Sequence, residues 1–455
     1  MPAAAVPGLT HALATFVAEF DGRDLPPAVQ AEATRAFVNA VGGMLGGARH
    51  DAVERTFRTA LPFSGGAQAT VFGRRETLGA LDAALVNCQA SAAHAYDDTH
   101  LATVLHPAGP VLAPLLAEAE RRPVSGADLL ASFAIGVELS CRAASMIARP
   151  PAENYVGWYM TSVASPIGAA AGVARLIGLS AEQTAHALGI ASAASAGFRQ
   201  VLGSMCTSLL PGHASRAGYW AALLAAEGVT ASETSLEGPR GFAEAFAPKA
   251  HPAHASQGLG ARWDMLENMA KPYPCGIVVH PILDACLAIA ATPGFDAATV
   301  QAVEVQVNPL CLTLTDRPAP PDSQRAQISL QHWSAAALIC GAAGIPEGSE
   351  AAVADPDIRA LAARVEPRPD PTIATDSAHV AVVLADGTRL ARRIDHALGS
   401  LERPMTDAEI DAKFLGQAAL TLPQPDAAAI LALCRRIADL PDAAAVARAI
   451  NAAVG

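Results

Sequence analysis

The sequence predicts a mainly α-helical protein, in which a large all-helical domain is joined to a smaller α+β domain with an antiparallel sheet. Of its 455 residues, 51% are hydrophobic but only 5% are aromatic, so alanine, valine and leucine supply most of the apolar surface. Alanine-rich runs favour closely packed helices. Up to about residue 265, apolar residues recur every three to four positions, as on one face of a helix. Beyond Lys271 they alternate with polar residues, which is typical of strands.

The first region, residues 1–266, carries the start and stop signals of helices. Ser180-Ala-Glu-Gln183 has the form of a capping box, and it follows Gly178, at which the preceding helix would end. Ser125-Gly-Ala-Asp128 begins another helix in a similar way. Only Ala67–Phe72 looks extended. We therefore expect residues 1–266 to form the all-helical domain.

The second region, residues 267–424, mixes strand and helix signals and is expected to form the α+β domain. Asp386-Gly387 is a strong hairpin signal, and alternating runs lie before and after it. The expected strands are Val303–Val307, Val380–Ala385 and Arg389–Ile394, and the expected helices are Pro281–Ala291, Ser329–Cys340 and Asp407–Lys413. An alanine-rich helical pattern returns at residues 425–455, and we expect these helices to complete the first domain.

Charge and hydropathy argue against several classes of partner. The formal net charge is −12, the isoelectric point is near 5.5 and no run of lysine or arginine occurs, so we expect neither nucleic acid nor a membrane as partner. The mean hydropathy is +0.28, but the longest stretch free of charge and histidine, Asn154–Ala174, contains Pro166. This stretch fits a loop that enters a buried helix better than a membrane span. Met1–Phe20 lacks the features of a secretory signal, which predicts a cytoplasmic protein.

Metal and nucleotide motifs find little support in the sequence. The eight cysteines are scattered and none forms a C-x-x-C pair, which argues against an iron–sulfur cluster or a zinc knuckle. His251 and His254 form an H-x-x-H, but no carboxylate lies nearby, so we expect no metal site. No G-x-S-x-G, P-loop or G-x-G-x-x-G stands in its proper context, and this argues against serine hydrolases and nucleotide binding.

Three short segments carry the residues that could perform chemistry. The densest lies at the end of an apolar helical run and combines two adjacent carboxylates, Asp97 and Asp98, with the imidazoles of His94, His100 and His106. Such groups are costly to bury unless they are paired, and an acid–base site requires them. The alternative is a solvated helix terminus at which the two aspartates act as caps.

The second segment is Lys271-Pro-Tyr273-Pro-Cys275, which Gly276–Val279 and His280-Pro281 follow. Lysine occurs only three times in the chain, so Lys271 beside a proline-rich loop is conspicuous. The alternative is a lysine at the domain junction whose alkyl stem covers apolar surface.

The third segment is a loop of small and hydroxyl residues that includes Cys206, Thr207 and Ser208 and precedes an alanine-rich helix. Backbone N–H groups at such a helix start can hold a carboxylate. A purely structural loop is the alternative.

These segments, in this order, resemble the 2-methylcitrate dehydratase family (MmgE/PrpD), which also contains cis-aconitate decarboxylases and iminodisuccinate epimerases. The resemblance covers the whole chain, and it implies a helical domain built from both chain ends, an α+β domain, a cleft between them and a homodimer. Its matches include Leu25-Pro26, Gly42-Gly43, Asn87, Asp97-Asp98-Thr99, His106-Pro107, Gly157-Trp158, Gly203-Ser-Met205, Leu236-Glu237-Gly238, Lys271-Pro-Tyr-Pro-Cys275, His280-Pro281, Ser329-Leu330, Arg403-Pro404-Met405 and Lys413-Phe414.

The resemblance also implies metal-free, cofactor-independent proton transfer at a carbon next to a carboxylate of a small organic acid. Loss of water, loss of CO2 or return of the proton then decides the product. Such chemistry requires a base, donors for the substrate carboxylates and an acid. By position, the expected catalytic residues are His106 for proton transfer, Lys271 for carboxylate pairing or proton delivery, Asp98 for orientation and Tyr159 as acid or oxyanion donor. Substrate binding is expected from His100, Cys206, Thr207, Ser208, Tyr273 and His280.

At several positions the chain departs from the family pattern. An aspartate, a histidine, a lysine and a second histidine of the family are replaced, in that order, by Ala95, Tyr159, Thr207 and Leu210. Each lost charge-assisted hydrogen bond weakens binding by roughly 1.5 to 3 kcal/mol, so a citrate-sized trianion would be poorly neutralised. Arginines that could compensate are Arg142, Arg149 and Arg199.

We therefore predict a lyase for an acid that is less charged and more apolar than 2-methylcitrate. Two alternatives stay open. One is an isomerase or epimerase that uses the same proton transfer, and the other is a catalytically degenerate binding protein.

Overall fold

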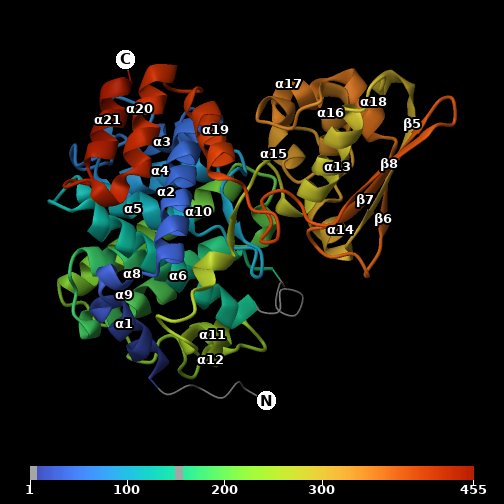
Figure 1. The fold of residues 1–455 in the computed structure, drawn as a ribbon. Coiled ribbons are helices and arrows are strands. Elements are labelled where there is room, and N and C mark those ends of the chain that lie inside the picture. The colour runs from blue at the N-terminus through green and yellow to red at the C-terminus, as the bar shows by residue number, and fades with distance from the viewer. Residues whose placement is uncertain (1–7, 149–156, 455) are drawn as a thin grey trace.

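The computed structural model describes residues 8–148 and 157–454 and is 57% helical, which confirms the predicted fold class (Figure 1). The long helices of the first part lie side by side, and the short ones cover one end of them. They are α1 (Leu9–Glu19), α2 (Pro27–Gly47), α3 (Asp51–Ala60), α4 (Ala80–Ala92), α5 (Ala108–Ala119), α6 (Gly126–Ala148), α8 (Met160–Leu176), α9 (Ala181–Ala193), α10 (Cys206–Ala226), α11 (Phe242–Phe246) and α12 (Pro252–Ser256).

The predicted helix signals are confirmed. Ser180 Oγ accepts a hydrogen bond from the backbone N–H of Gln183, and Gln183 Oε1 accepts one from the N–H of Ser180, both at 3.1 Å, so α9 begins with a capping box. Gly178 ends α8 in the left-handed conformation (φ 75°) that favours glycine. Ser125 Oγ accepts from the N–H of Asp128 at 3.1 Å at the start of α6.

Two described helices bear on the question of a membrane. Within residues 8–148 and 157–454, α6 alone is long and apolar enough to cross a membrane, but its apolar window is entirely buried inside the protein. The uncharged stretch that ends at Ala174 forms α8, and its residues from Met160 to Ala174 are buried as predicted. Residues 154–156 of that stretch lie outside the described residues.

The α+β part stands beside the helical part in Figure 1. Its sheet has the strand order β6-β5-β7-β8, and helices cover one face of it. The strands are β5 (Val300–Val307), β6 (Val365–Pro369), β7 (Ala378–Leu384) and β8 (Arg389–Ile394). The helices are α13 (His280–Ala290), α14 (Pro309–Thr315), α15 (Ser323–Ala326), α16 (Leu330–Cys340), α17 (Glu350–Ala354) and α18 (Pro356–Ala362).

The predicted hairpin is present, but the sheet is mixed rather than purely antiparallel. Strands β7 and β8 pair antiparallel around a turn in which Gly387 has φ 85° and Asp386 Oδ1 accepts from the N–H of Thr388. Strand β6 pairs parallel to β5 and was not predicted. Its two prolines, Pro367 and Pro369, weaken the strand signal, and an edge strand tolerates them because one side needs no ladder hydrogen bonds.

Short strands in the first part also escaped the sequence analysis. The extended segment expected at Ala67–Phe72 contains a shorter strand, β1 (Ala69–Thr70), which pairs with β2 (Thr77–Leu78). Strand β3 (Asp98–His100) pairs antiparallel with β4 (Asn268–Ala270), about 170 residues further along the chain. Two or three residues are too short for alternation to be recognised in the sequence.

The buried apolar side chains form two clusters. The second runs from Cys275 to Val382 and fills the α+β part. The first fills the helical part and includes C-terminal side chains from Met405 to Ile450, so the chain returns to the first core before residue 425. Figure 1 shows these last helices beside α2 and α3, and they are α19 (Asp407–Ala418), α20 (Gln424–Arg435) and α21 (Ala445–Ala453).

Candidate active site

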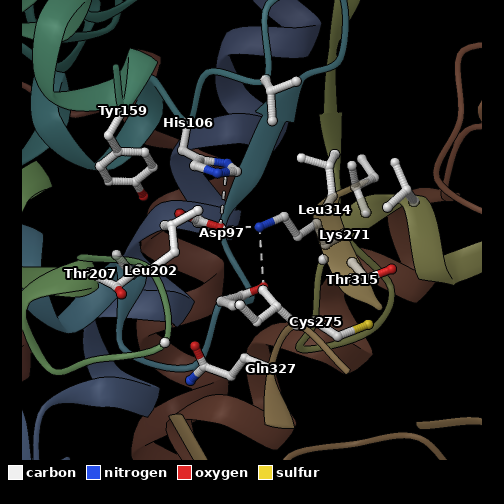
Figure 2. A pocket seen from close by; sticks show the side chains of 18 of the residues that line it. Asp97, His106, Tyr159, Leu202, Thr207, Lys271, Cys275, Leu314, Thr315 and Gln327 are labelled. Carbon is white, nitrogen blue, oxygen red and sulfur yellow. Dashed lines mark hydrogen bonds and ion pairs between the residues drawn. The ribbon is translucent and has the colours of Figure 1, made fainter. Parts of the chain in front are cut away.

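A cavity of about 100 Å³ lies where the helical and α+β parts meet (Figure 2). One wall is formed by the turn between α4 and β3, by His106 and by Tyr159. The facing wall is formed by Lys271, Cys275–Val278 and the end of α14. Further lining residues are Leu202, Gly203, Thr207, Gln324, Gln327 and Ile328. All three sequence segments therefore reach the same cavity.

Strands β3 and β4 bring Asp97 and Lys271 together at the cavity. Asp98 pairs with Ala270 in the ladder, so Asp97 and Lys271, one residue beyond this pair, lie next to each other. Lys271 Nζ donates to Asp97 Oδ1 at 2.5 Å and to the carbonyl oxygen of Ala95 at 3.2 Å, and Figure 2 shows these contacts. The Lys271 side chain is only 3% exposed and that of Asp97 10%, so this is a buried ion pair that is sensitive to the loss of either partner.

His106 lies beside this ion pair as a neutral imidazole. Its Nδ1 lies 2.7 Å from the carbonyl oxygen of Asp98, which can only accept, so Nδ1 carries the hydrogen and Nε2 keeps its lone pair. Burial lowers the pKa of His106, and the nearby Lys271 lowers it further, although Asp97 opposes this. A neutral His106 with a free lone pair on Nε2 can act as a base.

Asp97 is held in its charged form. Burial alone would raise the pKa of its carboxyl, but His106, Lys271 and the hydrogen bond from Lys271 together bring that pKa below its usual value. Asp97 Oδ1 lies 3.7 Å from His106 Nδ1, so one carboxylate faces both candidate acid–base groups.

Asp98, which was expected to orient a neighbour, does not line the cavity. Its Oδ2 accepts from Asn268 Nδ2 at 2.6 Å and from the N–H of Ala108 at 3.1 Å. Burial and the charge of Asp97 raise the pKa of its carboxyl to about 6. Its contact with the acid–base cluster is made by the backbone, through the carbonyl that holds His106.

Lys413 on α19 is a further part of this site, and the sequence indicates it only as a position shared with the family pattern. Its Nζ donates to Asn39 Oδ1 at 2.6 Å and to the carbonyl oxygens of Tyr96 and Lys271, both at 2.8 Å. It also lies 4.1 Å from the centre of the Tyr96 ring. Burial and the charge of Lys271 lower its pKa to about 7. The sequence feature that could have indicated a role for Lys413 is the scarcity of lysine in this chain.

Tyr159 and Thr207, which were expected in the site, also line the cavity. The Tyr159 ring centre lies 6.4 Å from that of His106, and the backbone N–H of Tyr159 donates to the carbonyl oxygen of Gly197 at 3.1 Å. Thr207 donates its hydroxyl to the carbonyl oxygen of Val201 at 3.0 Å.

The structure places the other expected substrate-binding residues outside the cavity lining. The His100 ring bonds Thr103 Oγ1 at 2.8 Å, and the Tyr273 hydroxyl donates to Asp284 Oδ1 at 2.6 Å. His280 is buried with its ring 5.4 Å from that of Tyr273, and burial lowers its pKa to about 3. Cys206 and Ser208 lie in the first turn of α10, on either side of Thr207. The positions of these residues in the sequence did not indicate the directions in which their side chains point.

Of the three arginines considered as carboxylate donors, Arg199 lines the cavity. Arg142 is fully buried in α6, pairs with Glu138 and donates to the carbonyl oxygens of Ala255 and Gln257, so it holds the helical part together. Arg149 lies outside the described residues.

The rest of the cavity wall is largely apolar. Leu202, Ile277, Val278, Leu314 and Ile328 line it together with the amides of Gln324 and Gln327. Two lining residues have left-handed backbone, Ala95 with φ 50° and Val104 with φ 55°. This conformation is strained for a β-branched residue such as valine, and such strain is concentrated at functional sites.

Fold and site together define a class of protein: a mainly helical protein with an acid–base cluster in a cavity between two hydrophobic cores. Family models of the MmgE/PrpD N-terminal domain and of the MmgE/PrpD C-terminal domain match residues 11–255 and residues 273–439. The chain therefore belongs to the MmgE/PrpD family, and the resemblance seen in the sequence is confirmed.

The relatives found include three cis-aconitate decarboxylases. The human protein is 27% identical over 398 residues, which cover 84% of this chain and 81% of the human chain. The mouse protein is 27% identical over 410 residues, with 86% and 82% covered. That of Aspergillus terreus is 27% identical over 292 residues, with 61% and 59% covered. These similarities support a lyase of the decarboxylase type.

Proposed function

We propose that this protein is a lyase that transfers a proton at a carbon next to a carboxylate of a small organic acid and expels CO2 or water. The observation that carries the proposal is the buried Lys271–Asp97 ion pair beside a neutral His106 in one cavity. The names of the relatives favour decarboxylation over dehydration.

The three side chains divide the chemistry among them. In a decarboxylation, the bond between carbon and carboxylate breaks, CO2 leaves, and the electron pair passes into a neighbouring double bond or carboxyl group. The Lys271 ammonium then delivers a proton to carbon, and Asp97 keeps this ammonium oriented. In a dehydration, His106 Nε2 takes the proton from carbon and Lys271 protonates the departing hydroxide. Base, acid and charge stabilisation thus all come from side chains of this cluster.

We further propose that the substrate is less charged and more apolar than 2-methylcitrate. Ala95 and Thr207 line the cavity where the resemblance expects an aspartate and a lysine, and Leu202, Ile277 and Leu314 line it as well. Apolar walls favour a substrate with a hydrocarbon part, because its burial contributes about 25 cal/mol per Å². The homodimer and the cytoplasmic location stay predictions.

The first test is proton NMR in heavy water with acids that carry one to three carboxylates, including cis-aconitate, citrate, 2-methylcitrate and iminodisuccinate. We expect turnover or deuterium incorporation that falls by about 10²- to 10⁴-fold in His106→Ala and Lys271→Ala. His213→Ala and Lys249→Ala, which change exposed residues away from the cavity, serve as matched controls. Circular dichroism shows whether each variant is folded, and Lys271→Arg keeps the charge if Lys271→Ala unfolds.

Each other outcome decides against a part of the proposal. Strong preference for citrate or 2-methylcitrate contradicts the apolar, less charged substrate. Deuterium incorporation with inversion and without loss of CO2 or water identifies an isomerase. Binding that survives both active-site substitutions, without exchange in any acid, identifies a binding protein.

A further inference from the structure

Two glutamine amides at the cavity are held by residues of the helical part. Gln324 and Gln327 line the cavity from α15 and the turn after it, which belong to the α+β part. Gln324 Nε2 lies 3.1 Å from His50 Nε2, and Gln327 Nε2 donates to the carbonyl oxygen of Ala93 at 2.9 Å. His50 and Ala93 lie at the start of α3 and the end of α4. The two amides therefore connect both parts of the molecule at the cavity.

The partner of Gln327 determines the orientation of its amide. A carbonyl oxygen can only accept a hydrogen bond, so the amide nitrogen lies on the side of Ala93 and the oxygen is left for the cavity. Figure 2 shows this oxygen on the side of Asp97. The backbone carbonyl of Gln327 accepts from the N–H of Gly276 at 3.0 Å. Gln327 thus offers the cavity an acceptor, which a carboxylate cannot use.

His50, the partner of Gln324, is a neutral imidazole whose hydrogen lies on Nε2. Its Nδ1 accepts from the backbone N–H of Ala52 at 3.2 Å, so this nitrogen carries no hydrogen. Burial lowers the pKa of His50, which keeps the ring neutral. The His94 ring lies edge-on to it at 5.2 Å, and burial lowers the pKa of His94 to about 4. His50 therefore presents an Nε2–H donor to Gln324.

This donor determines which end of the Gln324 amide faces His50. Two N–H donors 3.1 Å apart repel each other, whereas the amide oxygen accepts from His50 Nε2. A half-turn about the last side-chain bond exchanges oxygen and nitrogen within the same space. Among the described residues, only His50 bonds the Gln324 side chain. With the oxygen on His50, the NH2 group is left without a protein partner.

The backbone on either side of Gln324 is fixed by other contacts. Glu350 Oε1 accepts from the N–H of Ser323 at 3.0 Å and from its hydroxyl at 2.6 Å. Asp322 Oδ1 accepts from the N–H of Arg325 at 2.8 Å. The place of Gln324 in the cavity wall therefore does not depend on His50, whereas the direction of its amide does.

We propose that Gln324 is a substrate-binding residue whose NH2 group donates to a carboxylate oxygen of the bound acid, and that His50 is the positioning residue for this amide. A hydrogen bond from an amide to a carboxylate is charge-assisted, and it requires no further cation beside the Lys271–Asp97 pair. The inference deepens the proposed function and rests on it for the group that is bound. The orientation of the amide does not depend on that function.

Nitrogen NMR of the histidine side chains tests the orientation in the ligand-free protein. The two neutral tautomers of imidazole give different nitrogen shifts, and His50→Asn identifies the signals of His50. We expect the hydrogen on Nε2 at neutral pH. A hydrogen on Nδ1 overturns the proposal, because Gln324 would then donate to His50 and present its oxygen to the cavity.

Isothermal titration calorimetry with hexanoate, a monocarboxylate with an apolar chain, tests the contact itself. We expect Gln324→Leu to weaken hexanoate binding at least ~10-fold, and Gln324→Glu to weaken it further because the carboxylates repel each other. Gln301→Leu, at an exposed position of β5, is the matched control and should bind as the wild type does. Circular dichroism shows whether each variant is folded.

His50→Asn separates the positioning role from a structural one. Asparagine is a good N-cap for α3 but is too short to reach Gln324. We expect this variant to keep the melting temperature of the wild type and to bind hexanoate ~3-fold or more weakly. When Gln324→Leu is already present, His50→Asn should weaken binding little further, because the amide that it positions is gone.

Each other binding result decides against a part of the proposal. Equal hexanoate affinity in wild type and Gln324→Leu overturns it, and so does a wild type that does not bind hexanoate. An effect of His50→Asn that is fully retained beside Gln324→Leu refutes the positioning role. Binding that depends on Gln324, in a protein that turns over no acid, leaves the contact standing and refutes the lyase. Turnover that is unchanged in Gln324→Leu does the reverse.

Discussion

Asp97 and Asp98 are neighbours in the chain, but their carboxylates lie in different surroundings. The Asp97 carboxylate meets Lys271 and His106, whereas that of Asp98 points the other way and meets an amide and a backbone N–H. Successive side chains of an extended segment point to opposite sides, which explains this separation. As a result, the pKa of Asp97 is lowered and that of Asp98 is raised to about 6.

The raised pKa of Asp98 predicts a pH-dependent stability. Between about pH 4 and pH 6, the folded protein keeps a proton on Asp98 that the unfolded chain has lost, so this residue makes the protein less stable as the pH rises. Over this window the wild type should lose about 3 kcal/mol of unfolding free energy relative to Asp98→Asn. Urea unfolding from pH 3.5 to pH 7 measures the difference.

Asp357→Asn, at an exposed aspartate of α18, is the control and should follow the pH dependence of the wild type. If Asp98→Asn also runs parallel to the wild type, Asp98 is charged in the folded protein at low pH, and the assigned environment is wrong.

At the scale of elements, the helical part depends on close approach between α6 and α8. An added Cβ at Gly168 would lie 2.3 Å from the carbonyl oxygen of Gly136 and 1.9 Å from Ser140 Oγ. Backbone cannot move aside as a flexible side chain can. These glycines therefore allow two largely buried helices to pack at short distance.

Paired glycine substitutions test this packing. Gly168→Ala should destabilise the protein by about 1 to 3 kcal/mol, because overpacking outweighs the better helix propensity of alanine. Gly416→Ala in α19 is the matched control, since nothing lies within 4 Å of the added Cβ, and it should stabilise by about 0.5 to 1 kcal/mol. Thermal and chemical unfolding give both values. Equal changes in the free energy of unfolding for the two variants would show that helix propensity alone determines their stability.

At the scale of the whole molecule, the site is assembled from segments that lie far apart in the chain. The Asp97–Lys271 ion pair comes from both sides of a ladder that joins residues 98–100 to residues 268–270. The C-terminal α19 then reaches back and bonds the backbone of both strand ends through Lys413. Three segments that are far apart in the chain thus determine where the Lys271 ammonium lies.

Lys413→Met should loosen the junction at which α19 contacts the ends of β3 and β4. The substitution removes three hydrogen bonds, each of which contributes about 1 kcal/mol, and leaves buried carbonyls without a donor. We expect faster amide hydrogen exchange at residues 96–100 and 268–273, with no change in β5, β7 and β8. Lys249→Met, at an exposed position outside this site, should leave exchange at residues 96–100 and 268–273 unchanged. Unaltered exchange at the junction in Lys413→Met would refute the bracing role.

The sequence by itself determined the fold class, the helix caps at Ser125 and Ser180, the hairpin at Asp386-Gly387 and the family. These features depend on residues close together in the chain or on motifs in a given order. It also selected His106 and Lys271, because both stand at positions of the family pattern and lysine is rare in this chain. The sequence did not predict short strands such as β3 and β4, because three residues are too few to show a periodic pattern.

Only the tertiary structure decided which candidate side chains share the cavity. It brought Asp97 to Lys271 and turned Asp98, Tyr273 and His280 elsewhere. It also placed Lys413 of α19 against the backbone carbonyls of Tyr96 and Lys271. The physical reason is that the contacts of Asp97, Asp98 and Lys413 join residues more than 100 positions apart in the chain. Local propensity contains no information about such contacts, whereas the buried ion pair and the hydrophobic cores depend on them.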